Sequence, residues 1–131
     1  MTSTAEMIGV VGGGQLARML VQAAAERHVP IAVQTPSGQD PASEGATRQV
    51  SADPRDVAGT RDLVQGCCGV TFENEWVDIA ALRPLERQGV CFSPGLKALL
   101  PLVDKLSQRQ LLDELAIPAP PWCALTEISP S

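Results

Sequence analysis

A glycine-rich segment near the N-terminus constrains the fold more than any other feature of the sequence. The glycines at positions 12–14 follow the apolar run 7–11, and apolar residues then recur at helical spacing over residues 15–27. A buried strand, a tight glycine turn and an amphipathic helix, in this order, are typical of the first unit of an open parallel sheet. The sequence therefore predicts an α/β protein.

Apolar segments alternate with helical patterns along the rest of the chain. We predict further strands at residues 30–34, 48–51, 69–72 and 89–92, and helices that begin near residues 53–56, at Asp78 and at Asp104. This alternation predicts a Rossmann-like open parallel sheet of about five strands with helices on both faces. Pro118, Pro120 and Pro121 end the last helix, so we expect one domain over residues 1–117 and a proline-rich linker over residues 118–131.

Composition excludes several classes of function. The chain has 131 residues, with 10 Lys+Arg against 15 Asp+Glu and a formal net charge of −5, which argues against a nucleic-acid or anionic-membrane surface. No apolar run reaches the length of a membrane helix, and no basic segment typical of a secretory signal precedes the first one. His28 is the only histidine, and the four cysteines show no metal-ligand spacing. We therefore expect a cytoplasmic protein with free thiols.

The glycine turn predicts an anion site. The pattern Gly12-x-Gly14-x-x-Ala17 lies between a predicted strand and a predicted helix, where free backbone N–H groups attract a phosphate. We expect that phosphate near Gly14, Gln15 and Leu16; the alternative is a glycine turn that only allows close packing of strand and helix. A dinucleotide would also need an acid at the end of the second strand, and the first one after it is Asp40 in the following loop.

Charged residues beyond the later strands supply further candidates. Glu73 and Glu75 follow the fourth predicted strand, so they would lie at the same sheet edge as the glycine turn and could accept hydrogen bonds from ribose hydroxyls. The alternative is a solvated loop. Lys105 and Arg109 share a face of the last helix, where cations are equally typical of an ordinary surface.

Three segments together resemble a known family. They are IGVVGGGQLARM at residues 8–19, TFENE at residues 71–75, and DKLSQRQLL at residues 104–112 running into IPAPPW at residues 117–122. In order and spacing they resemble the N-terminal domain of the N5-carboxyaminoimidazole ribonucleotide synthetases. These enzymes are the ATPase subunits of phosphoribosylaminoimidazole carboxylase and belong to the ATP-grasp superfamily. Gln15 favours this family over a related formate-dependent transformylase, which carries Glu at that position.

The resemblance implies a role for each candidate residue. It implies that Gly14, Gln15 and Leu16 hold the phosphate of 5-aminoimidazole ribonucleotide, that Glu73 holds its ribose with Glu75 as a second candidate, and that Lys105 contacts ATP. It further implies ATP and Mg²⁺ as cofactors, bicarbonate as co-substrate, a role in purine biosynthesis, and a homodimer.

The same resemblance implies that catalysis needs more than this chain. Members of the family continue into an ATP-grasp domain, which holds the metal ligands and most of the ATP pocket. We therefore expect no catalytic residue and no metal ligand here, and a chain that is inactive alone. The alternatives are another ATP-grasp ligase, such as a formate-dependent glycinamide ribonucleotide transformylase, or a non-catalytic nucleotide-binding or regulatory Rossmann module.

Overall fold

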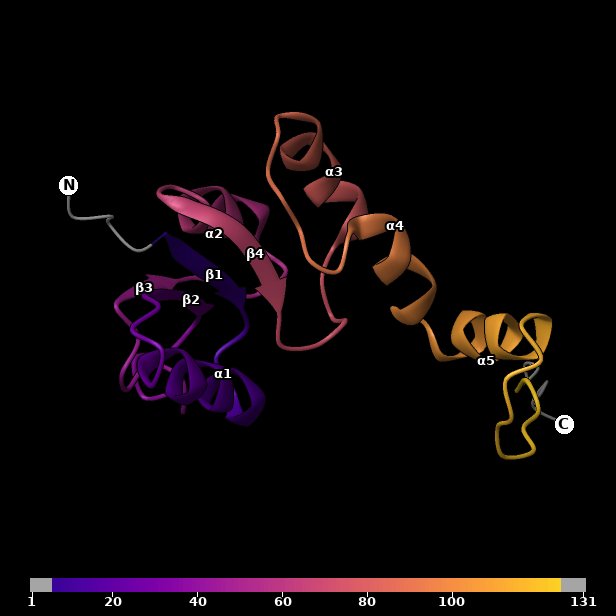
Figure 1. The fold of residues 1–131 in the computed structure, drawn as a ribbon. Coiled ribbons are helices and arrows are strands. Elements are labelled where there is room, and N and C mark those ends of the chain that lie inside the picture. Colours follow the sequence, from indigo (N-terminus) through magenta and orange to yellow (C-terminus); the bar gives the residue numbers. More distant parts are fainter. Residues whose placement is uncertain (1–5, 126–131) are drawn as a thin grey trace, which may run out of the picture.

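A four-stranded parallel sheet organises residues 6–125, the part of the chain that this computed structural model describes (Figure 1). The strands lie in the order β3-β2-β1-β4, so that the first strand is central. They are β1 (Met7–Val11), β2 (Ile31–Thr35), β3 (Arg48–Ser51) and β4 (Cys67–Phe72). Because β1 pairs in parallel with both β2 and β4, their carboxyl ends meet at one edge of the sheet.

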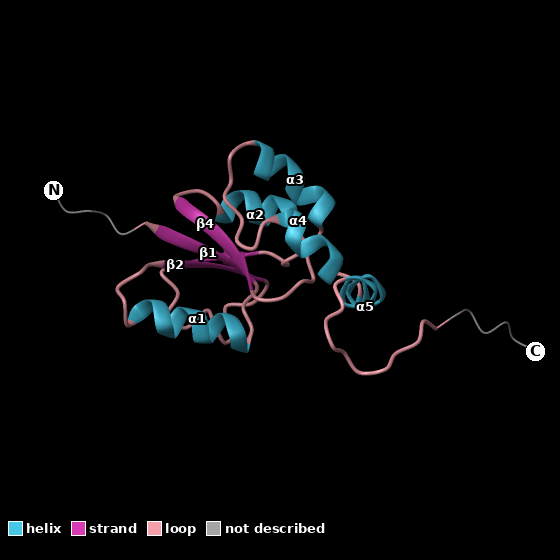
Figure 2. Cartoon of the chain, turned by 45° about the vertical axis from the view of Figure 1, so that its right-hand side comes forward, coloured by secondary structure: helices cyan, strands magenta, loops and turns pink. Residues whose placement is uncertain are grey.

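Helices cover the two faces of the sheet unequally. In Figure 2, α1 lies alone beneath the sheet, whereas α2, α3 and α4 lie on the opposite side. The helices are α1 (Gln15–Ala25), α2 (Val57–Leu63), α3 (Ile79–Arg87), α4 (Leu96–Leu99) and α5 (Lys105–Glu114), with a 3₁₀ turn η1 (Leu100–Leu102) before α5. Helix α5 projects away from the sheet and has no buried residue (Figure 1).

Three helices begin where the sequence places a capping aspartate. The carboxylates of Asp56, Asp78 and Asp104 each accept a hydrogen bond from a backbone N–H in the first turn of α2, α3 and α5 respectively. Such caps satisfy backbone donors that have no acceptor within the helix, and each typically stabilises a helix by about 1 kcal/mol. These local signals explain why the helix starts are close to the predicted ones.

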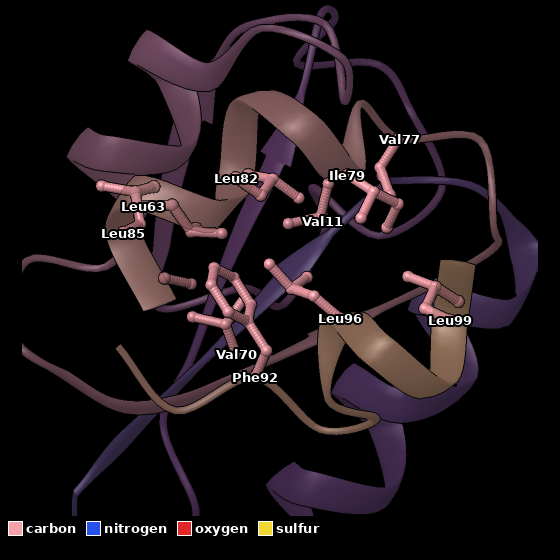
Figure 3. Packing of buried hydrophobic residues seen from close by; sticks show 11 residues of the cluster. Val11, Leu63, Val70, Val77, Ile79, Leu82, Leu85, Phe92, Leu96 and Leu99 are labelled. Carbon is pink, nitrogen blue, oxygen red and sulfur yellow. The ribbon is translucent and has the colours of Figure 1, made fainter. Parts of the chain in front are cut away.

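Each face of the sheet has its own apolar core. The larger core joins β1 and β4 to α2, α3 and α4, and its buried side chains include Val11, Leu63, Val70, Leu82 and Leu96 (Figure 3). The smaller core lies between the sheet and α1. There, Ala17 and Val21 of α1 pack with apolar residues of β1 and β2.

The predicted fifth strand is not formed as a strand. The sheet has four strands, and residues 89–92 contribute only an isolated parallel bridge between Phe92 and Val70. Val70 N–H donates to Cys91 O, and Val70 O accepts from Ser93 N–H. The next residue, Pro94, has no N–H with which to continue the pairing. The fold class is confirmed, and the strand count is corrected from about five to four.

Candidate ligand-binding site

The glycine turn and Glu73 meet at the carboxyl edge of the sheet. Val11 is paired with Phe72, so the residues that leave β1 and β4 are neighbours. Two backbone hydrogen bonds continue this alignment: Glu73 N–H donates to Val11 O at 2.9 Å, and Gly12 N–H donates to Gln34 O at 2.9 Å. The register of the sheet therefore brings together two of the three segments that the sequence singled out.

The Glu73 carboxylate caps helix α1 from a distance in sequence. Its Oε2 accepts a hydrogen bond from Gly14 N–H at 2.9 Å and its Oε1 one from Ala17 N–H at 3.5 Å. The N-cap residue of α1 is Gly14, which has no side chain to do this, and the first turn of α1 contains no acid. A negative charge at this end also interacts favourably with the positive end of the helix dipole.

Two backbone donors at the start of α1 remain available to a ligand. A helix leaves its first four N–H groups without an acceptor of its own, and Glu73 satisfies two of them. Within residues 6–125, the N–H groups of Gln15 and Leu16 have no hydrogen-bond acceptor. The helix end thus presents two free donors next to a carboxylate with unused lone pairs, an arrangement that can hold both acceptor and donor groups of a ligand.

Glycine is required here because of Glu73. A Cβ atom on Gly12 would lie 2.6 Å from Glu73 Oε2, and a Cβ on Gly14 would also collide with that carboxylate. Gly12 has φ +114°, a conformation that residues with side chains rarely adopt. The sequence suggested a phosphate site as the reason for these glycines, with close packing of strand and helix as the alternative; in the structure they admit the carboxylate of Glu73. Because Gly14 has no side chain with which to cap α1, the sequence did contain a signal that another residue caps this helix.

The Asp40 side chain lies against the end of the second strand, β2. Asp40 Oδ2 accepts hydrogen bonds from the Thr35 hydroxyl and, at 3.2 Å, from Ser37 N–H. The same loop is joined to the glycine turn by a bond from Ala42 N–H to Gly13 O at 2.9 Å. Asp40 therefore closes the loop that follows β2, and Ala42 of the same loop bonds to the glycine turn.

Glu75 and Lys105 connect this edge to helix α5. The Lys105 ammonium lies 3.4 Å from Glu75 Oε1, and the two side chains are 74% and 28% exposed. The pKa of the Glu75 carboxyl is held below its ordinary value, chiefly by a hydrogen bond from its own backbone N–H and also by the Lys105 ammonium. At this exposure the pair contributes little to stability.

The candidate residues therefore form two neighbouring groups. Gly14, Gln15, Leu16 and Glu73 meet at the start of α1, whereas Glu75 joins Lys105 at the start of α5. Arg109 forms no side-chain hydrogen bond or ion pair with the described part of the chain. No group of three metal-ligating side chains occurs among residues 6–125, and no helix there is long and apolar enough to span a bilayer.

A family model, curated sequences and solved structures all relate this chain to ribonucleotide synthetases. The family "Ribonucleotide synthetase preATP-grasp domain" matches residues 5–100. The N5-carboxyaminoimidazole ribonucleotide synthase of Synechocystis is 46% identical over 121 residues, which are 92% of this chain and 31% of that protein. The synthase of Synechococcus elongatus is 47% identical over 94% of this chain and 31% of its own length.

Solved structures agree with the sequence comparison. The N5-carboxyaminoimidazole ribonucleotide synthetase of Thermotoga maritima has a TM-score of 0.79 at 31% identity, over 88% of this chain and 32% of that one. An Aspergillus clavatus synthase in complex with ADP and 5-aminoimidazole ribonucleotide has a TM-score of 0.69 at 30% identity, over 87% and 30%. The chain spans about a third of the length of the relatives it matches. It belongs to the family of ribonucleotide synthetase pre-ATP-grasp domains.

Proposed function

We propose that this chain is the part of an ATP-dependent carbon–nitrogen ligase that binds 5-aminoimidazole ribonucleotide. In this proposal the ligase carboxylates the ribonucleotide with bicarbonate to N5-carboxyaminoimidazole ribonucleotide in purine biosynthesis. The observation that carries the proposal is the contact between the Glu73 carboxylate and the backbone of Gly14, which joins two of the segments shared with the synthetases. The complex of the Aspergillus clavatus relative supports the choice of ligand.

The two kinds of group at the start of α1 match two parts of a ribonucleotide. In our proposal the phosphate accepts hydrogen bonds from the free N–H groups of Gln15 and Leu16, and the ribose hydroxyls donate to Glu73. Glu73 lies beside the same helix end, so its charge opposes a phosphate placed there. We therefore propose that the ribose is the group that brings the ligand to Glu73, and that Glu75 is a secondary contact.

Lys105 is the proposed contact to ATP. It occupies the first position of α5, where the helix dipole disfavours a cation unless an anion is near. In the structure Glu75 supplies that anion at 3.4 Å. A triphosphate that approached this helix end could replace Glu75 as the partner of Lys105. Relatives whose structures contain ADP or ATP, from Staphylococcus aureus and Aspergillus clavatus, support a nucleotide in the whole enzyme.

Catalysis itself is proposed to need residues that the longer relatives possess. Transfer of a phosphoryl group requires metal ions and cationic clamps around the reacting oxygens, and the described residues contain no metal-ligating cluster. The acidic Mg²⁺ ligands, the remaining ATP pocket and the bicarbonate site would lie in the ATP-grasp part of the enzyme. The whole enzyme is proposed to be a cytoplasmic homodimer.

Calorimetry with the 131-residue chain tests the proposal. We expect weak binding of 5-aminoimidazole ribonucleotide and of ribose 5-phosphate, no binding of NAD, and no ATP hydrolysis when ribonucleotide and bicarbonate are added. Glu73→Ala should weaken ribonucleotide binding, whereas Arg109→Ala serves as the control. Tight binding of NAD, or unchanged ribonucleotide affinity in the Glu73 variant, would overturn the assignment. Binding of glycinamide ribonucleotide alone would favour a related ligase.

A further inference from the structure

One face of the sheet is only partly covered. Parallel sheets are normally buried on both faces by helices. Here α2, α3 and α4 pack on one face, whereas α1 alone lies against the other, as Figure 2 shows. Helix α1 packs over β1 and β2 through Ala17 and Val21. The part of that face formed by β4 therefore lacks a covering helix within residues 6–125.

A cavity of about 510 Å³ lies at this uncovered part. It extends between α1 and β4 and is open to solvent on one side. Leu20 and Ala23 of α1, with Arg27 just after the helix, form one wall, and Gly69 and Thr71 of β4 form the other. Its lining is predominantly apolar, and the small residues on β4 leave room for side chains from elsewhere.

The apolar surface continues from the cavity along α1. Leu16, Met19 and Leu20 are 59%, 56% and 42% exposed, although each is a large apolar side chain. Their spacing of three and four residues places them on one side of the helix. We call this stripe, together with the cavity beside it, the α1–β4 groove. A continuous apolar surface of this kind is typical of an interaction site and not of free surface.

We propose that the α1–β4 groove is the docking surface for a segment of the synthase polypeptide that this chain does not contain. The first argument is length: the cyanobacterial relatives match 92–94% of this chain, yet the match is 31% of their own length, so about two thirds of each synthase must pack somewhere. The second is position, because the groove begins at Leu16, next to the free N–H groups of the candidate site. A segment docked there would adjoin the proposed ligand.

The chemistry of the groove specifies that segment. It should present two or three aliphatic or aromatic side chains to Met19, Leu20 and the cavity, because these surfaces are apolar. It should also bring a carboxylate near Arg27, which is exposed and lines the cavity rim. A second copy of this chain and a small apolar molecule are the competing occupants.

A chimeric synthase tests the proposal. The chimera carries this chain in place of the matched 121 residues of the Synechocystis synthase. Amide hydrogen exchange of α1 should be at least tenfold slower in the chimera than in the 131-residue chain, and binding of an apolar fluorophore should be largely lost. Met19→Asp should lower the melting temperature of the chimera by about 5 °C or more and leave that of the chain alone unchanged, because Met19 is exposed there.

A second substitution on α1 serves as the control for Met19→Asp. Ala25→Asp replaces another exposed residue of α1, away from Leu16, Met19 and Leu20, and should change the melting temperatures of chain and chimera by equal amounts. Equal exchange and fluorophore binding in chain and chimera would overturn the proposal, as would a chimera that does not fold. A chain that forms dimers which Met19→Asp dissociates would instead identify a second copy as the occupant. The proposal rests on the proposed function, because it takes this chain to be part of such a ligase. None of these readouts depends on ribonucleotide binding, so a failure of the proposal can be distinguished from a failure of the proposed function.

Discussion

Removing the Glu73 carboxylate should destabilise the glycine turn and the start of α1 together. Glu73 satisfies two backbone N–H groups of a helix whose own N-cap residue is glycine. Loss of a side-chain cap costs about 0.5–2 kcal/mol, and loss of a negative charge at a helix start costs about 0.3–1 kcal/mol more. We therefore expect Glu73→Ala to lower the free energy of unfolding by about 2 kcal/mol. Glu73→Gln keeps an acceptor oxygen and should cost about half as much.

Urea unfolding followed by circular dichroism measures this effect. Glu75→Ala is the matched control, because it removes a carboxylate from the same loop whose partner, Lys105, is 74% exposed. That control should cost less than about 0.5 kcal/mol. The reasoning would be refuted if the Glu73 and Glu75 variants lost equal stability. An amide spectrum in which Gly14 and Ala17 did not shift in the Glu73 variant would contradict it as well.

Three further predictions concern the scaffold around the site. Gln34→Leu leaves the carbonyls of Asp53 and Asp56 without their side-chain donor and removes the nearer of the two acceptors of the Thr60 hydroxyl. It should therefore cost about 3 kcal/mol by urea unfolding, and a cost as small as that of a typical surface substitution would contradict the network. Hydrogen bonds from the backbone N–H and hydroxyl of Ser107 lower the pKa of Asp104, so this cap of α5 should be complete above the carboxyl's unfolded pKa of about 3.9 and should be lost as the pH falls through the lower folded pKa. The Ser107 amide shift should report that loss, and an Asp104→Asn variant that titrated in the same way would disprove it. Burial raises the pKa of the Cys67 thiol, so at pH 8 iodoacetamide should modify it more slowly than the exposed Cys68; equal rates in peptide mass spectrometry would contradict this.

Local signals in the sequence were sufficient for most of the elements. The strand before the glycine turn, the third strand at Arg48–Ser51 and the capping residues of α2, α3 and α5 lie where apolar periodicity and capping aspartates predict them. Helix α4 and η1 were not predicted, because four-residue and three-residue elements are too short to show periodicity. The fifth strand was overpredicted, since an apolar run cannot reveal that only Phe92 forms a bridge.

The candidate site was predicted in its location but not in its contacts. The order of strands and helices was enough to place Glu73 at the same edge as Gly14. It could not indicate that the carboxylate hydrogen-bonds to the turn itself, because that contact depends on the register between β1 and β4. The role of Arg48 was missed for the same reason. Its guanidinium donates to the carbonyls of Asp62, Leu63 and Gln65 at the end of α2, which adjoins β3 only in the folded chain.

The bond between Gly14 and Glu73 also bears on how the chain folds. Its two residues are 59 positions apart, so it can form only after β4 has joined β1 and closed a long loop of chain. The unit of β1, α1 and β2 is local and can assemble first, with the start of α1 still uncapped. Formation of the candidate site would then be one of the last steps in folding. In that case, substitutions at Glu73 should speed unfolding and leave the folding rate nearly unchanged, as for any contact absent from the transition state.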